Sequence, residues 1–210
     1  EKIYFHCGFF GTSYQRQSLK KLGFRFWQLL DAKRYKSLRA GEIIAIKLSS
    51  ERLNPTAQLC KMIRSAFVKQ PVANPFRKIY LTREHVKSGR KVVNELELIT
   101  LLKSNGFQVV IPGRLNVMAQ ARLFNESKFI ISPHGASLAN LAFCEPGVKV
   151  IELFNQHDRS TWSPLYSKIS KACGLNLTSL APQQIEGEGE SHHRSNFYTD
   201  LNAIQAIIES

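Results

Sequence analysis

Short apolar runs recur along the second half of the chain, separated by stretches that have helical spacing. The predicted strands are 78–81, 107–111, 128–132 and 149–154, and the predicted helices are 94–104, 117–124, 137–143 and 162–173. Gly106 is expected to follow the end of the first helix, where glycine adopts a left-handed conformation at little cost. Strands of four to six residues that alternate with helices indicate βαβ units. We therefore expect an α/β fold with a Rossmann-like parallel sheet and helices on both faces.

The flanking parts of the chain have a different pattern. Their predicted elements are strands at 2–5 and 43–46, a helix over 58–67, an exposed loop over 182–194 and a final helix over 201–208. Pro71 and Pro75 follow the helix, and proline cannot continue one. We therefore place a domain boundary here, between unit 1–70 and unit 71–210.

The net charge indicates more about possible binding partners than the overall composition does. Lys and Arg number 29 against 16 Asp and Glu, a formal net charge of +13. Such a field attracts nucleic acid, acidic membranes or phosphorylated sugars, although surface lysine alone produces the same excess. The aromatic residues fall mostly at core-like positions and do not alternate with Lys and Arg. A nucleic-acid-binding module is therefore a distant alternative.

The four cysteines are Cys7, Cys60, Cys144 and Cys173. They are widely spaced, without a Cys-x-x-Cys pair or a histidine at zinc-ligand spacing, so we expect reduced structural thiols. No apolar run approaches the roughly 20 residues that cross a bilayer. The 43% hydrophobic content is that of a folded globular protein.

The turn after the strand 128–132 carries the first candidate chemistry. His134 and Gly135 stand between that strand and a helix, and the backbone N–H groups of a helix N-terminus favour phosphate. Gly135 allows another backbone to approach closely. The alternative is structural: Gly135 makes a tight turn and His134 caps it.

A second turn follows the strand 78–81. Arg83 comes directly after it and Arg90 precedes the next helix, so two guanidinium groups can reach the same crevice beyond the strand ends. Arginine binds phosphate as a planar fork. Salt bridges to Glu84, Glu95 or Glu97 are the equally weighted alternative.

Glu152 stands inside the apolar strand 149–154, where an unpaired carboxylate is costly. Two partners remain open for it. It can accept hydrogen bonds from ribose hydroxyls, or it can pair with an arginine.

These pieces together resemble glycosyltransferase family 61. The matching residues are Arg83, 90–97 (RKVVNELE), 106–107 (GF), 133–140 (PHGASLAN) and 150–153 (VIEL). The resemblance covers about 79–154, with a fainter part over 15–23. It implies a two-domain enzyme of the GT-B type that transfers a sugar from a nucleotide donor with inversion. Unit 1–70 is then the remnant of an acceptor-side Rossmann-like domain, and unit 71–210 is the nucleotide-sugar-binding domain.

The resemblance also implies roles for single residues. His134 stabilises the leaving diphosphate, and the expected donor-binding residues are Arg83, Arg90, Asn94, Glu95, His134, Gly135, Ala136, Ser137, Asn140 and Glu152. Family members commonly have glycine where this chain has Ser137, which we expect to cap the helix. The segment with His and Asp in the family's first domain has no counterpart here. The catalytic base is unassigned, with Glu84, His85 and His6 as candidates.

The expected reaction needs no metal ion and no cofactor. The chain has only three aspartates, Asp31, Asp158 and Asp200, and they form no Asp-x-Asp pair of the kind that holds a divalent ion. Positive groups aimed at the leaving charge can replace the ion. We expect an inverting transferase that uses a UDP-sugar donor and a glycan or other hydroxyl acceptor. A non-catalytic nucleotide- or phosphosugar-binding domain is the alternative.

Two expectations concern the compartment. Residues 125–127 and 176–178 match the N-glycosylation acceptor triplet, which suits a secretory lumen. Dispersed cysteines and the absence of a targeting pattern favour a bacterial cytosol instead. The family resemblance adds capsule or surface-polysaccharide synthesis as the setting.

Overall fold

The computed structural model describes residues 4–7, 12–31, 33–37, 39–43, 55–84, 86, 89–153, 165–182, 184–185 and 195–210. In chain order its strands are β1 (Phe5–Cys7), β2 (Leu29–Asp31), β3 (Arg77–Leu81), β4 (Gln108–Val110), β5 (Ser127–Pro133), β6 (Lys149–Leu153), β7 (Asn176–Leu180), β8 (Gln184–Ile185) and β9 (Phe197–Tyr198). The α-helices are α1 (Ser13–Lys21), α2 (Ala57–Phe67), α3 (Glu95–Ser104), α4 (Val117–Asn125), α5 (Leu165–Cys173) and α6 (Leu201–Glu209). Three 3-10 helices are η1 (Phe26–Gln28), η2 (Pro112–Arg114) and η3 (Ala136–Phe143).

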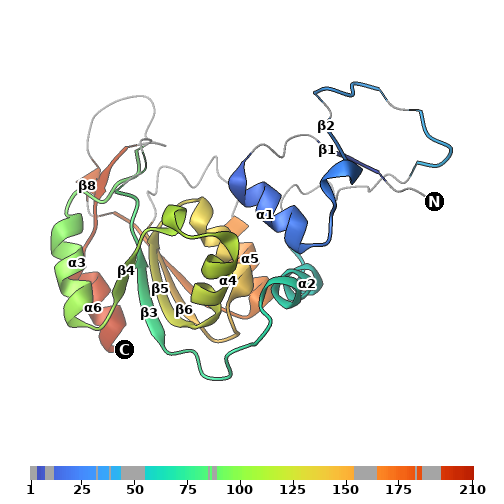
Figure 1. Ribbon diagram of the computed structural model, residues 1–210. Helices are drawn as coiled ribbons and strands as arrows, with labels where there is room; N and C mark the ends of the chain where they lie inside the picture. Colours follow the sequence, from blue (N-terminus) through green and yellow to red (C-terminus); the bar gives the residue numbers. More distant parts are fainter. Residues whose placement is uncertain are drawn as a thin grey trace.

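A parallel sheet forms the centre of the molecule (Figure 1). Within the described residues it has five strands, in the order β4-β3-β5-β6-β7, and every neighbouring pair is parallel. The chain moves outward from β3 to β4 and then returns to place β5 on the other side of β3. This reversal creates a crevice between the carboxyl ends of β3 and β5, where open α/β sheets bind ligands. The predicted α/β, Rossmann-like fold is confirmed.

Helices cover both faces of the sheet because side chains alternate along its strands. On β3, Ile79 and Leu81 enter one core cluster, together with buried residues of α2, α4, η3 and α5. Tyr80 enters the other cluster, with residues of α3 and α6. Figure 1 shows α3 and α6 together on one side of the sheet and α2, α4 and α5 on the other. The site is thus held at one end of a sheet that is packed on both faces.

The N-terminal elements lie beside this sheet domain. Strands β1 and β2 pair in parallel and form a small sheet of their own. Helix α1 contacts α4, where the backbone N–H of Val117 donates to Gln17 Oε1 at 2.9 Å. Helix α2 precedes the expected boundary at 70/71, yet its Cys60 and Phe67 are buried in the core of the sheet domain. The boundary itself stays a prediction.

The predicted elements agree closely with those observed from β3 to β6. Elsewhere the structure adds elements that were not predicted, among them α1, β2 and β9. The predicted helix 137–143 is the 3-10 helix η3. Strand β7 was not predicted, because its sequence NLTSL is polar and pairs only along the edge of the sheet. Most of the predicted strand 43–46 and of the loop 182–194 lies outside the described residues, as does the start of the predicted helix 162–173.

Gly106 has φ +79° directly after α3, as expected of a residue that ends a helix. Cys60, Cys144 and Cys173 are buried and unbridged, in agreement with structural thiols. Asn125, of the first glycosylation triplet, is 1% exposed and donates to Glu145 Oε1 at 2.8 Å, so its amide does not carry a glycan in this fold. Among the described helices, none has the length and apolar character that a membrane crossing requires.

Candidate active site

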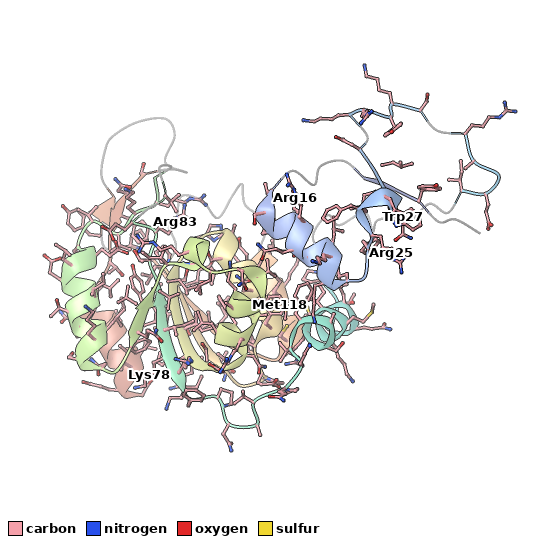
Figure 2. All side chains as sticks on the ribbon, in the orientation of Figure 1. Arg16, Arg25, Trp27, Lys78, Arg83 and Met118 are labelled. Atoms are coloured by element: carbon pink, nitrogen blue, oxygen red, sulfur yellow. The ribbon has the colours of Figure 1, made fainter. Side chains whose placement is uncertain are left out.

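The candidate site residues follow three adjacent strands of the main sheet. Arg83 comes after β3, His134 after β5, and Glu152 lies near the end of β6. Figure 2 labels Lys78 and Arg83, which mark the two ends of β3, and Arg83 lies at the carboxyl end. The parallel arrangement therefore brings together residues that are up to 69 positions apart in the sequence, at the crevice between β3 and β5.

His134 and Glu152 form a buried pair. His134 Nδ1 lies 2.6 Å from Glu152 Oε1, and the two side chains are 9% and 8% exposed. The other carboxylate oxygen, Oε2, accepts a hydrogen bond from Ser179 Oγ on β7 at 3.3 Å. The His134 backbone N–H donates to Leu153 O at 2.9 Å, which fixes the turn to β6. Within the described residues the ion-pair partner of Glu152 is His134 and not the arginine considered for it, and the contact with a ribose stays a prediction.

A carboxylate beside an imidazole orients the ring, because the Nδ1–H group donates to it. When both ring nitrogens carry a proton, Nε2 of His134 can donate a hydrogen bond to a ligand. Because the carboxylate itself is covered by Ser179 and by burial, the pair is oriented before any ligand arrives.

Arg83 lies directly over Gly135. A Cβ built on Gly135 would be 2.2 Å from Arg83 Nη1 and 3.4 Å from its Cζ, so a side chain at position 135 and this arginine cannot both keep their places. The glycine is needed for a close approach, as expected, but a guanidinium and not a backbone approaches it. Gly135 has φ 175°, an extended conformation open to any residue.

Two positive charges meet at this turn. Burial lowers the pKa of Arg83, the nearby Arg90 lowers it further, and Tyr166 acts in the opposite direction. Within the described part of the chain Arg83 makes no ion pair, and its Nε is buried without a hydrogen-bond partner. Arg90 has φ +63°, a left-handed conformation that is uncommon outside glycine and often found at functional sites. The salt bridges of Arg83 to Glu84, Glu95 or Glu97 are therefore absent.

Tyr166, which sequence reasoning missed, joins the same group. Its ring centroid lies 5.0 Å from that of His134, with the planes tilted by 58°. Burial raises its pKa and Glu152 raises it further, while Arg90 and Arg83 lower it. Tyr166 is the second residue of α5, the helix after β6. No sequence motif marks Tyr166. It reaches His134 because α5 packs against η3, a contact between segments that the sequence pattern does not predict.

Three of the predicted donor-binding residues serve as supports. The Asn94 side-chain amide exchanges two hydrogen bonds with the Thr199 backbone, each 3.0 Å long. Glu95 accepts from the Tyr80 hydroxyl and from Thr82 Oγ1, both at 2.7 Å, and so holds the residue before Arg83. Asn140 donates to Gln120 Oε1 of α4 at 2.8 Å. These hydrogen bonds connect Asn94, Glu95 and Asn140 to neighbouring elements of the fold and so help to position the site residues.

The start of η3 differs from the expectation for Ser137. The residue in the N-cap position is Gly135, and no side chain caps the helix. Ser137 is the second residue inside η3, two positions after the N-cap, so its hydroxyl is not the predicted cap. Ala136 is exposed at the first position and Ser137 is partly exposed. Their backbone amides remain at the turn that Arg83 crosses.

The three candidate bases have different positions. Glu84 is exposed and directly follows Arg83, and its backbone N–H donates to Thr82 Oγ1 at 3.1 Å. His85 lies outside the described residues. His6 is part of β1, in the small N-terminal sheet, and its side chain is not among those described. The assignment of the base stays open among the three.

A hollow of about 570 Å³ opens away from this site, between the edge strand β4 and helix α4. Three arginines line it: Arg77, Arg114 and Arg122. Two of them bind Glu126, Arg77 Nε at 2.6 Å and Arg122 Nε at 2.7 Å. Glu126 already pairs with two of these three arginines, whereas Arg83 has no such partner among the described residues, so we take the strand ends around His134 as the candidate site.

The comparison with protein families gives a match over most of the sheet domain. A family model described as Glycosyltransferase 61 matches residues 14–151, more than half of the chain. The chain belongs to glycosyltransferase family 61. A comparison with curated proteins finds no match. The family match contains Arg83, Arg90, His134 and Gly135, and supports glycosyltransferase activity. Groups of three or more His, Cys, Asp or Glu that can hold a metal ion are absent from the described residues of this family 61 chain.

Proposed function

We propose that the crevice between β3 and β5 binds the diphosphate of a nucleotide-sugar, and that the domain serves an inverting glycosyltransferase. The observation that carries this is the charge of the site. Arg83 and Arg90 lie close enough to lower the Arg83 pKa, and Arg83 keeps a buried Nε without a partner. A bound anion would relieve the repulsion and supply the missing acceptor.

The proposed reaction is a single displacement. The acceptor hydroxyl oxygen attacks the anomeric carbon from the side opposite the diphosphate, the new C–O bond forms as the bond to the β-phosphate oxygen breaks, and the acceptor proton passes to a base. Negative charge grows on the departing diphosphate. His134, held by Glu152 at 2.6 Å, donates to it. Donors that are already oriented toward developing charge stabilise the transition state more than the bound donor.

We further propose that the transfer is metal-independent and that the donor is a UDP-sugar. Arg83 and Arg90, with His134 as a further hydrogen-bond donor, can take the place of a divalent ion at the leaving group. The nucleotide base follows from the resemblance to the family, whereas phosphate binding follows from the residues. A GT-B arrangement, with the acceptor and the base held by a first domain, belongs to the same proposal. Bacterial surface-polysaccharide synthesis in the cytosol is its proposed setting.

The test is a thermal-shift titration of the chain with UDP in the presence of EDTA and, separately, with magnesium. A ligand that binds only the folded state raises the melting temperature by an amount that grows with the logarithm of its free concentration relative to its dissociation constant. We expect UDP to stabilise the chain equally in both conditions. Stabilisation that requires magnesium would overturn metal independence. The absence of any shift with UDP, ADP, GDP and dTDP would overturn nucleotide binding as a whole.

A second measurement separates catalysis from binding alone. If the domain is a non-catalytic nucleotide sensor, UDP binds but no preparation releases UDP from a UDP-sugar in an acceptor-dependent way. For the transferase, we expect slow release by this chain, because a GT-B site is completed between two domains. Acceptor-dependent UDP release that disappears in Glu84→Gln would also assign the base.

A further inference from the structure

One polar group at the site has no role in the reaction described above. Tyr166 places its ring 5.0 Å from that of His134, and its hydroxyl makes no hydrogen bond within the described residues. Tyr80 offers the internal comparison: its hydroxyl is buried and donates to Glu95 Oε1 at 2.7 Å. Partly buried tyrosine hydroxyls normally find a partner. Because the side chain of Tyr166 is only partly buried, its hydroxyl is open to a partner from outside the described chain, either water or a ligand.

The surroundings of Tyr166 indicate what that partner is. Glu152 raises the pKa of Tyr166 after burial has done so, while Arg90 and Arg83 lower it, so the ring lies within electrostatic reach of all three side chains. The carboxylate is already engaged by His134 and Ser179. The phenol keeps its proton at neutral pH and is a donor. A donor flanked by two guanidinium groups fits a ligand that carries several acceptor oxygens and negative charge.

We propose that Tyr166 is a donor-binding residue whose hydroxyl donates a hydrogen bond to the diphosphate of the bound nucleotide. The inference rests on the proposed function and adds a residue to it. The face of the same ring packs on His134, so Tyr166 also limits the orientations that the imidazole can adopt. Position 166 is thus a contact to the ligand that comes from α5, whereas Arg83 comes from the turn after β3.

The test uses a change to the protein and a matching change to the ligand. Tyr166→Phe removes the hydroxyl and keeps the ring on His134. Tyr14→Phe is the matched control, because Tyr14 lies on α1 and is 59% exposed. Dissociation constants of wild type and both variants are measured for UDP by calorimetry, and for uridine, which lacks the diphosphate, by ligand-observed NMR.

We expect Tyr166→Phe to weaken UDP binding by about tenfold or more, the usual effect of losing a hydrogen bond to a charged group. Uridine affinity and melting temperature should stay at their wild-type values, and Tyr14→Phe should change neither ligand's affinity. Equal UDP affinity in wild type and Tyr166→Phe would overturn the proposal. The same loss for uridine as for UDP would overturn it too, since the hydroxyl would then contact the nucleoside. A wild-type chain that binds no nucleotide would instead remove the proposed function, and the assignment of Tyr166 with it.

Discussion

Two pairs of arginines in the sheet domain have opposite surroundings. Arg77 and Arg122 lie on either side of Glu126 and each binds one of its oxygens, at 2.6 and 2.7 Å. Arg83 and Arg90 lie close to each other at the carboxyl end of the sheet, and Arg83 has no acidic partner among the described residues. The first pair neutralises an acid that is 7% exposed. In the second pair, Arg83 keeps its charge without an acidic partner among the described residues.

We interpret Arg77 and Arg122 as structural residues and Arg83 and Arg90 as ligand-binding residues. The backbone carbonyl of Glu126 accepts from the backbone N–H groups of Phe76 and Arg77, and these bonds together with the ion pairs connect the start of β3 to the end of α4. At the other end of β3, Arg83 carries a buried Nε without a partner, and Arg90 has a left-handed backbone. Groups that cost free energy in the folded chain persist where function requires them. The predictions below test this contrast.

The largest effect is expected at His134. In a preparation that transfers sugar, His134→Ala should lower the turnover rate by about a hundredfold or more and raise the donor KM only modestly. The reason is that a hydrogen bond from His134 strengthens as negative charge grows on the departing diphosphate. The measurement is steady-state UDP release at varied donor concentration, with the melting temperature recorded on the same preparation.

The structural alternative for His134 gives the opposite pattern. If the residue only holds the turn between β5 and η3, His134→Ala lowers the melting temperature and leaves the turnover per folded molecule nearly unchanged. A destabilised but fully active variant would thus remove His134 from the reaction.

The two arginine pairs should respond to truncation in opposite ways. Arg83→Ala should weaken UDP binding by about 1.5–3 kcal/mol and leave the melting temperature of the unliganded chain unchanged or higher. Arg90→Ala should weaken UDP binding in the same range. Arg77→Ala should lower the melting temperature, by about 2–4 °C for each kcal/mol lost, and leave UDP affinity unchanged. Calorimetric titration and thermal melts of the three variants give both quantities.

Arg83→Lys sharpens the same comparison. If Arg83 binds phosphate through two N–H groups, lysine restores the charge but not the affinity. If Arg83→Ala and Arg90→Ala bind UDP with wild-type affinity, these arginines are structural residues like Arg77 and do not bind the nucleotide.

Local patterns predicted the sheet domain well, and contacts between distant segments account for what they missed. The strands around Ile79, Ile130 and Ile151 were found because each is a short apolar run, and these residues are at most 1% exposed. Strand β7 has no such run. It is recognised only through its pairing with β6, which joins Glu152 to Ser179.

The site was predicted at the level of strand ends but not of partners. His134, Gly135 and Arg83 were expected near one another from the rule that parallel strands present their carboxyl ends together. The same rule could not show that Glu152 pairs with His134, that Asn94 and Glu95 serve as supports, or that Tyr166 packs on His134. Those facts depend on side-chain directions set by packing, and the sequence carries no local signal for them.

A smaller effect is expected from one added methyl group. Gly135→Ala places a Cβ 2.2 Å from Arg83 Nη1, so the guanidinium has to move, and UDP affinity should fall by about tenfold. Gly41→Ala is the matched control, because a Cβ there meets nothing within 4 Å. The comparison is made by calorimetry. If Gly135→Ala in the Arg83→Ala background causes the same further loss, the methyl group acts on something other than Arg83.

The smallest effect concerns pH at the structural pair. Burial raises the pKa of Glu126, but hydrogen bonds from Arg122 and Arg77 outweigh it and hold the pKa below its usual range. A carboxyl group with a depressed folded-state pKa stabilises the fold above its unfolded-state pKa of about 4.3, and this contribution is lost as the pH falls through the folded-state value. Glu126→Gln removes the titration and keeps the shape. The melting temperature of wild type should therefore exceed that of Glu126→Gln at pH 6, and the difference should shrink as the pH falls from about 5 to about 3. A difference that stays constant over this range would show that the two arginines do not stabilise the ionised carboxylate.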